Sequence, residues 1–347
     1  MASDAANFDN FGFSVSISSG KALVGARFDD DLGSGSGSAY IYELSGGGWT
    51  ETNKLLASDG GANDDFGYSV CLTGSRALVG ARLDDHVDVN TGSAYVFELN
   101  GGVWSETQKL QASDAAASDY FGNSVSIFGN KVIVGADGNV TTSGSAYIYE
   151  LSGGVWSETQ KLLASDGIAS SEFGSSCSIY GNRAVDGGRS NSEGAAYIYE
   201  LNNGIWAEVK KIESSDGVLG DNFGDAVAMF GDRIIVGAED NDDAGSNSGS
   251  AYIFEWNGVV MAGNNYLSSD NNSQLLPNPI KGIFTIDLGE VTENTSITVY
   301  DMLGKVIVRK ESITSTTQID LSGNEKGIYF VKMVNGENSI TRRIIKQ

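Results

Sequence analysis

The stretch ASDGGANDDFGYSVCLTGSRALVGARLDDHVDVNTGSAYVFELNGGVWSETQKL, residues 57–110, decides the fold because the chain repeats it. Its opening Ser-Asp pair recurs every 50 to 55 residues, with the aspartate at Asp4, Asp59, Asp114, Asp166, Asp216 and Asp270. Five near-copies at so long a period predict an array of near-identical supersecondary units.

Each copy carries further landmarks in a fixed order. A Phe-Gly pair comes first, at Phe11, Phe66, Phe121, Phe173 and Phe223. A Gly-Ala-type pair follows, starting at Gly25, Gly80, Gly135, Gly187 and Gly237. A Gly-x-Ala-Tyr then ends at Tyr40, Tyr95, Tyr147, Tyr197 and Tyr252, and a Trp closes the first four copies at Trp49, Trp104, Trp156 and Trp206. The order predicts that all five units share one internal architecture.

Four runs in each copy have strand character. In the first copy they cover 13–17, 22–26, 38–44 and 49–56, and Phe13, Val15 and Ile17 alternate with two serines, as in a half-buried strand. Glycine-rich clusters between the runs are typical of turns. The pattern predicts an all-β fold, a β-propeller of four-stranded blades, with an open β-solenoid as the alternative.

Packing between the blades accounts for the landmarks. A four-stranded sheet cannot bury both faces alone, so neighbouring blades must cover one another. We expect the Phe of each Phe-Gly to fill the gap between blades, and the Gly-Ala pairs to let strands crowd together. The five repeats present would form a five-bladed ring or part of a seven-bladed one, which needs about 100 more residues upstream.

These landmarks resemble the FG-GAP repeat, the blade unit of integrin α-chain heads and of many bacterial surface proteins. The resemblance covers residues 1–270. The fourth copy departs from it, because Asp186 stands where the second copy has Val79. A buried unpaired carboxylate would be costly, so we expect Asp186 either to lie at an exposed edge or to have a partner.

The repeat ends near residue 270. Residues 271–279 contain the only two prolines, Pro277 and Pro279, and predict a linker. Residues 280–347 carry six new strand-like runs, which predict a small Ig-like β-sandwich. Residues 275–347 hold 8 acidic and 9 basic side chains, so that 37 acidic and 13 basic ones of the chain's 45 and 22 lie before them. The two parts therefore have different electrostatics.

The tail resembles the type A sorting domain of the type IX secretion system. The matching residues are Pro277-Asn278-Pro279, Gly282 with Phe284, Val299-Tyr300-Asp301-Met302-Leu303-Gly304-Lys305, Ile319-Asp320-Leu321-Ser322, Gly327-Ile328-Tyr329 and Arg343-Ile344-Ile345-Lys346. The resemblance implies that residues 280–347 engage the type IX secretion machinery. The protein would then be secreted or held at the outer cell surface. An ordinary Ig-like binding module is the alternative.

Other protein classes are disfavoured. The net charge of −23 argues against nucleic-acid partners, and no apolar run is long enough for a membrane span. The start Met1-Ala2-Ser3-Asp4 has no signal-peptide features, which suggests a truncated, mature or cloned N-terminus. The single histidine, His86, lies in an acidic turn and is read as a solvated loop residue. Cys71 and Cys177 are not expected to form a disulfide.

Acidic turns between the Gly-Ala and Ala-Tyr strands give the candidate metal site. Oxygen ligands that alternate along a glycine-containing loop suit Ca²⁺, and integrin FG-GAP blades carry Asp-x-Asp-x-Asp-Gly loops at this kind of place. The alternative is a solvated acidic loop. The candidate ligands are Asp29, Asp31, Asp84, Asp88, Asp240 and Asp242, with Ca²⁺ as the candidate cofactor.

Two further patterns have structural explanations. Asp9, Asp64, Asp119 and Asp221 each precede a Phe-Gly by two residues, with Ser171 in the fourth copy, and we expect them to cap turns. The aromatic pairs that end the Ala-Tyr strands recur identically, which favours blade packing over a ligand surface.

The sequence therefore predicts a non-catalytic binding or adhesion-type β-propeller. It would bind an extracellular protein or glycan through loops on one face of the ring. The alternative is a polysaccharide hydrolase or lyase that uses paired carboxylates, although no one pair stands out among so many acidic residues.

Overall fold

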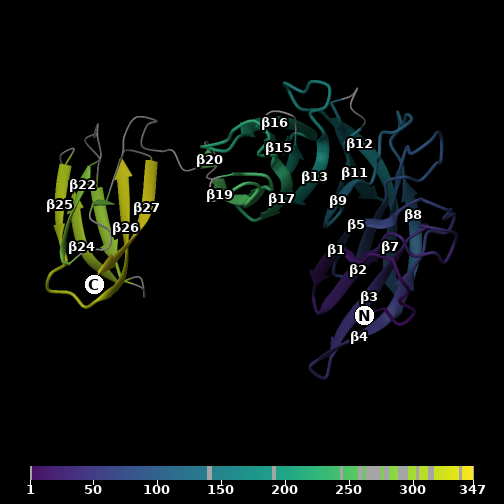
Figure 1. The fold of residues 1–347 in the computed structure, drawn as a ribbon, viewed down its shortest axis with the longest axis horizontal. Coiled ribbons are helices and arrows are strands. Elements are labelled where there is room, and N and C mark those ends of the chain that lie inside the picture. The colour runs from purple at the N-terminus through teal and green to yellow at the C-terminus, as the bar shows by residue number, and fades with distance from the viewer. Residues whose placement is uncertain are drawn as a thin grey trace. The chain divides into compact units, whose positions relative to one another are not determined.

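The computed structural model describes residues 2–138, 143–189, 193–242, 245–256, 261–262, 275–276, 281–287, 296–301, 305–311, 316–335 and 338–346. The described residues form strands and turns without a helix, and the chain divides into two compact units, Met1–Met261 and Ala262–Gln347 (Figure 1). The expected all-β class is confirmed.

The first unit contains five antiparallel sheets of four strands each. Sheet one has β1 (Phe11–Ser18), β2 (Lys21–Ala26), β3 (Ser38–Ser45) and β4 (Gly48–Leu55); sheet two has β5 (Phe66–Thr73), β6 (Arg76–Ala81), β7 (Ser93–Asn100) and β8 (Val103–Leu110). Sheet three has β9 (Ser124–Phe128), β10 (Lys131–Ala136), β11 (Ser145–Ser152) and β12 (Val155–Leu162); sheet four has β13 (Phe173–Tyr180), β14 (Arg183–Gly188), β15 (Ala195–Asn202) and β16 (Ile205–Ile212). Sheet five has β17 (Phe223–Phe230), β18 (Arg233–Ala238), β19 (Ser250–Trp256) and β20 (Met261–Ala262).

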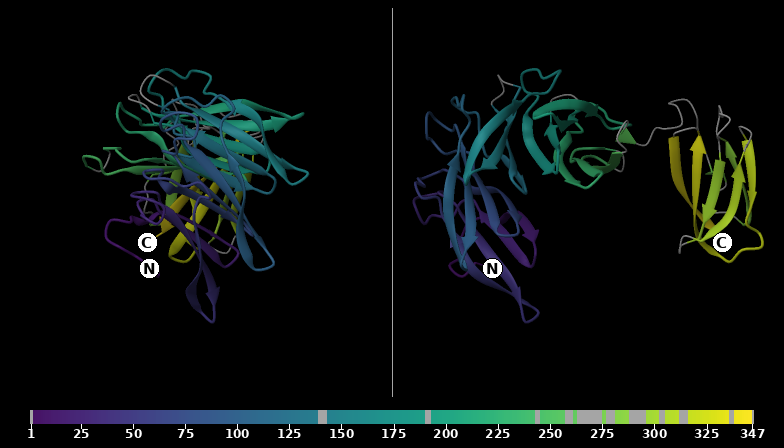
Figure 2. Two further views of the ribbon diagram at one scale, coloured as in Figure 1. Left: turned by 90° about the vertical axis from the view of Figure 1, so that its right-hand side faces the viewer. Right: turned by 180° about the vertical axis from the view of Figure 1, so that it is seen from behind.

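These sheets are propeller blades, numbered here 1 to 5. In each blade the strands follow one another in chain order, and consecutive blades stack along a curve (Figures 1 and 2). Four hydrophobic clusters of the first unit each combine side chains from two consecutive blades. The propeller architecture is therefore confirmed, and the stability of a blade depends on its neighbours.

The two ends of the strands in each blade carry different connections. Short turns, such as Ser19-Gly20 and Gly46-Gly47 in blade 1, join the first strand to the second and the third to the fourth. The longer connections, 27–37 and 56–65, lie at the opposite ends of the same strands because the strands are antiparallel. We call the ends of the strands that carry the longer connections the loop edge of the blade. The opposite ends of the strands, which carry the short turns, are the hairpin edge.

The Phe-Gly phenylalanines behave as expected. Phe66, Phe121, Phe173 and Phe223 are fully buried, and each ring meets the Tyr of the Gly-x-Ala-Tyr edge-on, with ring centroids 5.2 to 5.5 Å apart. The backbone of each of these residues forms a parallel bridge with a loop-edge glycine of the preceding blade. The Phe-Gly pair therefore joins two blades.

In blades 1 to 4, the glycine of the Gly-Ala pair lies against the backbone of the next blade. The carbonyl oxygen of Gly67 stands where a Cβ on Gly25 would have to go, and the same holds for Gly122 against Gly80. Crowding is thus confirmed, and its cause is the neighbouring backbone.

The turn-cap prediction is also confirmed. The carboxylates of Asp9, Asp64, Asp119 and Asp221 accept the backbone N–H three residues earlier, at 2.6 to 3.0 Å. Ser171 accepts the equivalent N–H of Ile168 at 2.9 Å, so the position requires an acceptor and not a charge. Cys71 and Cys177 are free, as expected.

The second unit has two sheets. One contains β21 (Leu275–Leu276), β22 (Ile283–Asp287) and β25 (Thr316–Asp320); the other contains β23 (Ser296–Tyr300), β24 (Val306–Glu311), β26 (Gly327–Asn335) and β27 (Asn338–Lys346). Both sheets contribute to one core, which includes Phe284, Ile319, Val299 and Val331. This is a small β-sandwich, and its Ig-like connectivity stays a prediction. Of the expected linker 271–279, only 275–276 is described, and it pairs with β22.

Candidate functional site

The aspartates of the Ser-Asp pairs anchor the loop edge. Each of the five that the structure describes accepts a hydrogen bond at 2.7 to 2.9 Å from the hydroxyl of the Tyr in its own repeat, the pairs being Asp4–Tyr40, Asp59–Tyr95, Asp114–Tyr147, Asp166–Tyr197 and Asp216–Tyr252. In the first four repeats a lysine of the fourth strand also binds the aspartate at 2.7 to 2.8 Å, namely Lys54, Lys109, Lys161 and Lys211. We call each such set an Asp-Tyr-Lys anchor.

The candidate calcium ligands of repeat 1 lie around one of these anchors. Asp4, Asp29 and Asp31 bring carboxylate oxygens within 4.8 Å of one another. The Lys54 ammonium nitrogen lies 2.7 Å from Asp4, 3.1 Å from Asp29 and 2.6 Å from Asp31. Burial alone would lower the pKa of Lys54, but the carboxylates outweigh burial and raise it. The lysine therefore supplies the positive charge that a metal ion would bring, and these residues do not fit calcium.

Repeat 2 repeats this arrangement in part. Asp84 is buried and lies 2.6 Å from the Lys109 ammonium, which also holds Asp59 at 2.8 Å. Asp88 is exposed, and its carboxylate accepts the backbone N–H of Val89 at 2.8 Å. In the part of the chain that the structure describes, Asp84 and Asp88 therefore have different binding partners and share none.

Repeat 5 differs because the sequence has no Lys or Arg between Arg233 and Lys281. Asp240 accepts amide N–H groups from Asn222 at 2.8 Å and Asn247 at 2.6 Å, and Asp242 accepts the backbone N–H of Asn247 at 2.6 Å. The charge of nearby Asp225, followed by burial, raises the pKa of Glu239. Amide N–H groups bind the carboxylates of Asp240 and Asp242 in this loop. Repeat 5 is therefore the loop in which lysine or arginine side chains would compete least with a bound cation.

We expect calcium to act only through repeat 5. Excess Ca²⁺ added after EDTA should raise the melting temperature of the first unit, because a ligand that binds the folded state stabilises it. All five tryptophans lie before residue 262, so tryptophan fluorescence reports on the first unit alone. Asp242→Asn should abolish the shift, and Asp31→Asn should leave it unchanged. A wild-type melting temperature that ignores calcium would remove all three loops as calcium sites.

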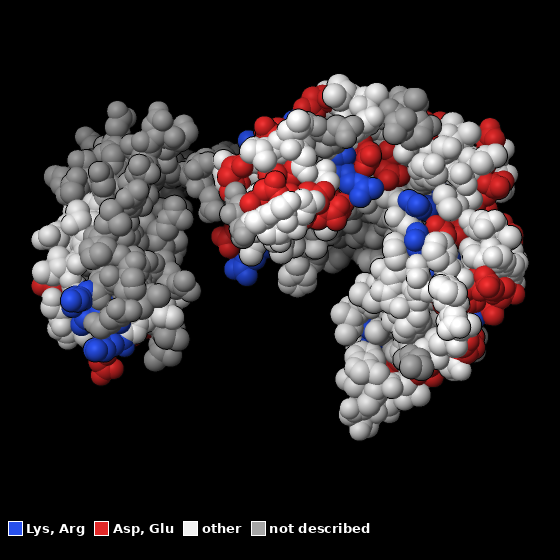
Figure 3. All heavy atoms as spheres, viewed as in Figure 1, with Lys and Arg blue, Asp and Glu red and all other residues white. Residues whose placement is uncertain are grey.

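A second row of charges lies at the loop edge, which we call the charged row. It consists of the residue after each Gly-Ala pair: Arg27, Arg82, Asp137, Arg189 and Glu239. Arg27 and Arg82 both approach Asp65, at 3.5 and 3.6 Å, and Arg189 binds Glu172 at 2.6 Å and Asp225 at 3.0 Å. Figure 3 shows basic and acidic side chains side by side on the first unit.

Aromatic rings support the arginines of this row. The Arg27 guanidinium carbon lies 4.2 Å from the ring centre of Phe13 and 4.1 Å from that of Phe28, and the Arg82 carbon lies 4.2 Å from that of Tyr68. Such stacking holds the guanidinium groups in place. The charged row was not predicted from the sequence. Its signal is a charged residue after all five Gly-Ala pairs, and the varying sign of that charge obscures the pattern.

Asp137 of this row and the nearby Asp186 are among the carboxylic acids whose pKa is raised. Burial raises the pKa of Asp137 to about 6, against the opposing charges of Arg82 and Arg189. Asp186 is fully buried, and burial raises its pKa well above the ordinary value. The expected partner of Asp186 is the backbone N–H of Gly174, which donates to one carboxyl oxygen at 2.6 Å. The alternative, an exposed edge, is wrong.

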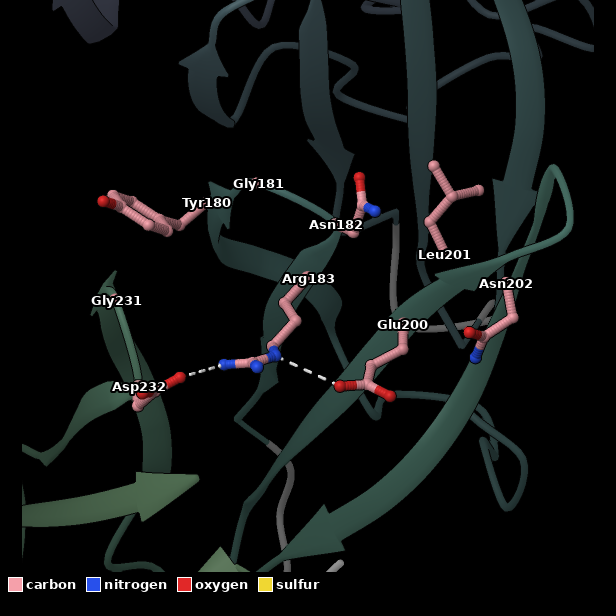
Figure 4. Close-up of a pocket in the computed structure, with 9 residues that line it drawn as sticks. All are labelled: Tyr180, Gly181, Asn182, Arg183, Glu200, Leu201, Asn202, Gly231 and Asp232. Carbon is pink, nitrogen blue, oxygen red and sulfur yellow. Dashed lines mark hydrogen bonds and ion pairs between the residues drawn. The ribbon is translucent and has the colours of Figure 1, made fainter. Parts of the chain in front are cut away.

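A pocket of about 350 Å³ lies at the hairpin edge between blades 4 and 5 (Figure 4). Arg183 points between Glu200 of its own blade, at 3.1 Å, and Asp232 of the next blade, at 2.6 Å. Arg76 makes the same kind of link, to Glu98 and to the carbonyl of Gly129 in the next blade. The charges of this pocket therefore connect blades, which favours a structural role.

The fold and these sites define a β-propeller protein with a separate β-sandwich tail. The FG-GAP repeat pattern matches residues 1–42, 49–97, 104–149, 156–199 and 206–254, and the chain belongs to the FG-GAP repeat family. Residues 274–347 match the secretion system C-terminal sorting domain. This domain directs export through the type IX system to the cell surface or the extracellular space and implies contact with the secretion machinery. The described residues include no helix that could cross a membrane.

Other comparisons give more distant similarity. No curated protein matches the chain. A crystal structure of a protein from Lactobacillus plantarum is similar at 13% identity and a TM-score of 0.48, over 89% of this chain and 88% of that one. A putative 6-phosphogluconolactonase from Bacteroides uniformis is similar at 12% identity and a TM-score of 0.49, over 93% and 88%.

Proposed function

We propose that the protein is an exported, non-catalytic binding β-propeller. Its partner is an extracellular protein or a glycan, which contacts the loop edge of the blades. Export is given by the sorting domain. The proposal of a binding role rests on the contrast between the two edges, because in blades 1 to 4 the hairpin edge has two-residue turns whereas the loop edge has long connections.

The observation that carries the proposal is the stacked pair Arg27 and Arg82. Both guanidinium groups rest on aromatic rings and share Asp65, and their side chains keep part of their surface exposed. Because contacts within the protein already hold these guanidinium groups in place, binding to them costs little side-chain conformational entropy. Arg and Tyr are also the residue types that contribute most to protein interfaces.

Binding should depend on the charged row. In a screen of the purified chain against extracellular glycans and surface proteins, Arg82→Ala with Tyr68→Ala should weaken the interaction about tenfold or more, as hot-spot truncations do. Arg233→Ala is the matched control, because Arg233 is an exposed arginine of the hairpin edge paired with Glu255. Equal losses in both variants would contradict a loop-edge site.

The alternative, a carboxylate-dependent glycan hydrolase or lyase, has one candidate acid. Asp137 has a pKa of about 6, which suits a group that donates and accepts protons near neutral pH. The same screen separates the two proposals if product formation is followed along with binding. Turnover by the wild type that Asp137→Asn abolishes would refute the non-catalytic proposal.

A further inference from the structure

Each blade has two faces, and blade 1 leaves one of them uncovered. We call the face toward the preceding blade the rear face and that toward the following blade the forward face. The first strand of each blade carries two apolar residues on its rear face. In blades 2 to 5 these residues all pack in clusters between two blades: Val70 and Leu72, Val125 and Ile127, Cys177 and Ile179, Val227 and Met229. The same positions in blade 1 are Val15 and Ile17, and both are 70% exposed.

A tryptophan marks the same rear face. Trp104, Trp156 and Trp206 are buried against the preceding blade, whereas Trp49 of blade 1 is 45% exposed. The side chains of Val15, Ile17 and Trp49 are thus exposed on blade 1, whereas their equivalents in blades 2 to 4 pack against the preceding blade. Exposed apolar surface of this kind marks an interaction site.

Blade 5 leaves the complementary face uncovered. The forward-face pairs of blades 1 to 4 are fully buried: Leu23 and Ile41, Leu78 and Val96, Ile133 and Ile148, Val185 and Ile198. In blade 5 these positions are Ile235 and Ile253, which are 43% and 66% exposed. The residues remain large and apolar although no blade covers them.

Gly237 gives an independent indication that a backbone approaches this forward face. Its equivalents in blades 1 to 4 must be glycine because a carbonyl oxygen of the next blade occupies the Cβ position. A Cβ on Gly237 would meet nothing closer than Ala226, at 3.5 Å, and its φ lies outside the left-handed region. The structure as described gives no reason for glycine here, whereas a Phe-Gly strand packed on blade 5 would.

We propose that the forward face of blade 5 in one copy packs on the rear face of blade 1 in a second copy. This contact continues the interface that the chain already makes four times between its own blades. It is heterologous, since two different surfaces meet, so each copy keeps one free face for a further copy. We assign both faces to a second copy of the chain because the contact repeats the interface between its own blades.

Two substitutions in blade 5 make this contact weaker than an internal one. In blades 1 and 4, serines of the first strand form hydrogen bonds with the next blade. The hydroxyl of Ser14 donates to the Gly67 carbonyl at 2.7 Å, and that of Ser176 donates to the Gly224 carbonyl at 2.8 Å. The hydroxyl oxygen of Ser178 accepts the Met229 N–H at 3.0 Å. Blade 5 has Ala226 and Ala228 at these positions. The association should therefore be reversible and depend on concentration. Salt should strengthen it, because both copies are strongly acidic.

Sedimentation of the full chain over a concentration series tests the proposal. We expect reversible growth in mass, accompanied by a blue shift of Trp49 fluorescence. Ile17→Lys or Ile253→Lys should each weaken self-association about tenfold or more, equivalent to about 1.4 kcal/mol. Val103→Lys is the matched control, since Val103 is exposed and its equivalents Val155 and Ile205 are exposed as well. Ala226→Ser with Ala228→Ser should strengthen association.

A mixing experiment tests the head-to-tail geometry. The Ile17→Lys chain keeps a free forward face and the Ile253→Lys chain keeps a free rear face, so the two should form a 1:1 complex that grows no further. A wild type that stays monomeric over the whole concentration series would overturn the proposal. This holds whether another part of the same chain or a different protein covers the two faces. Self-association that survives Ile253→Lys would overturn it in favour of a symmetric contact through blade 1.

Discussion

Replacing Phe121 with alanine is expected to lower the free energy of unfolding of the first unit by about 3–5 kcal/mol. Phe121 is fully buried and belongs to a cluster that joins Leu78 and Val96 of blade 2 to side chains of blade 3. Its ring meets Tyr147 and Tyr149 edge-on, at 5.4 and 6.1 Å between ring centroids. Removing it leaves a cavity at the junction of two blades that neither backbone can close.

Phe11→Ala provides the matched comparison. Phe11 makes the same edge-on contacts within its own blade, 5.4 Å from Tyr40 and 6.2 Å from Tyr42, but it is only partly buried. We expect its loss to cost about half as much, because burial sets the transfer contribution. Urea unfolding followed by tryptophan fluorescence measures both variants. Equal costs would mean that the phenylalanine acts within its blade and not between blades.

Much of the fold could be predicted because the repeat supplied five independent samples of one pattern. The alternation of Phe13, Val15 and Ile17 with serines located β1, and the same pattern in other copies removed the ambiguity that a single short run leaves. The capping aspartates were predictable for a related reason. Ser171 replaces the carboxylate once, which favoured a structural role over one that requires charge.

The candidate site was predicted less well, because strand register decides which charges meet. No role was predicted for Lys54 from the sequence, yet β3 and β4 pair so that Lys54 lies opposite Tyr40 and reaches Asp29. A loop that looks like a metal site from its aspartates alone thus contains its own cation. The charged row was hidden in the same way, since Arg27 and Asp65 lie in different repeats and only blade stacking brings them within 3.5 Å.

Asp186 gives the last prediction, because the repeat supplies its natural replacement. The equivalent residues are Val24, Val79, Val134 and Val236. One carboxyl oxygen of Asp186 accepts the Gly174 N–H, and the other has no hydrogen-bond partner among the residues that the structure describes. In blade 3 the equivalent N–H, of Gly122, donates to the Gly135 carbonyl at 3.0 Å, so Asp186→Val leaves Gly174 an alternative acceptor.

The pH dependence follows from the raised pKa of Asp186 in the folded state. Above the unfolded-state pKa of about 4, the unfolded chain releases this proton whereas the folded chain retains it, so stability falls as pH rises towards the folded pKa. The wild type should therefore lose about 1.4 kcal/mol per pH unit through this residue over that window. In Asp186→Val that contribution disappears, and the variant should exceed the wild type by a margin that widens with pH.

Urea unfolding of the two proteins at a series of pH values from about 4 to 8 measures this margin. Slopes from buried carboxyls whose charge does not act on Asp186, such as Asp64, are common to both proteins and cancel in the difference. Asp186→Asn is the control for shape, because an amide keeps the bond to Gly174 but cannot ionise, so it should also remove the slope. Parallel wild-type and variant curves would show instead that the folded protein holds Asp186 as a carboxylate, with a compensating charge beside it.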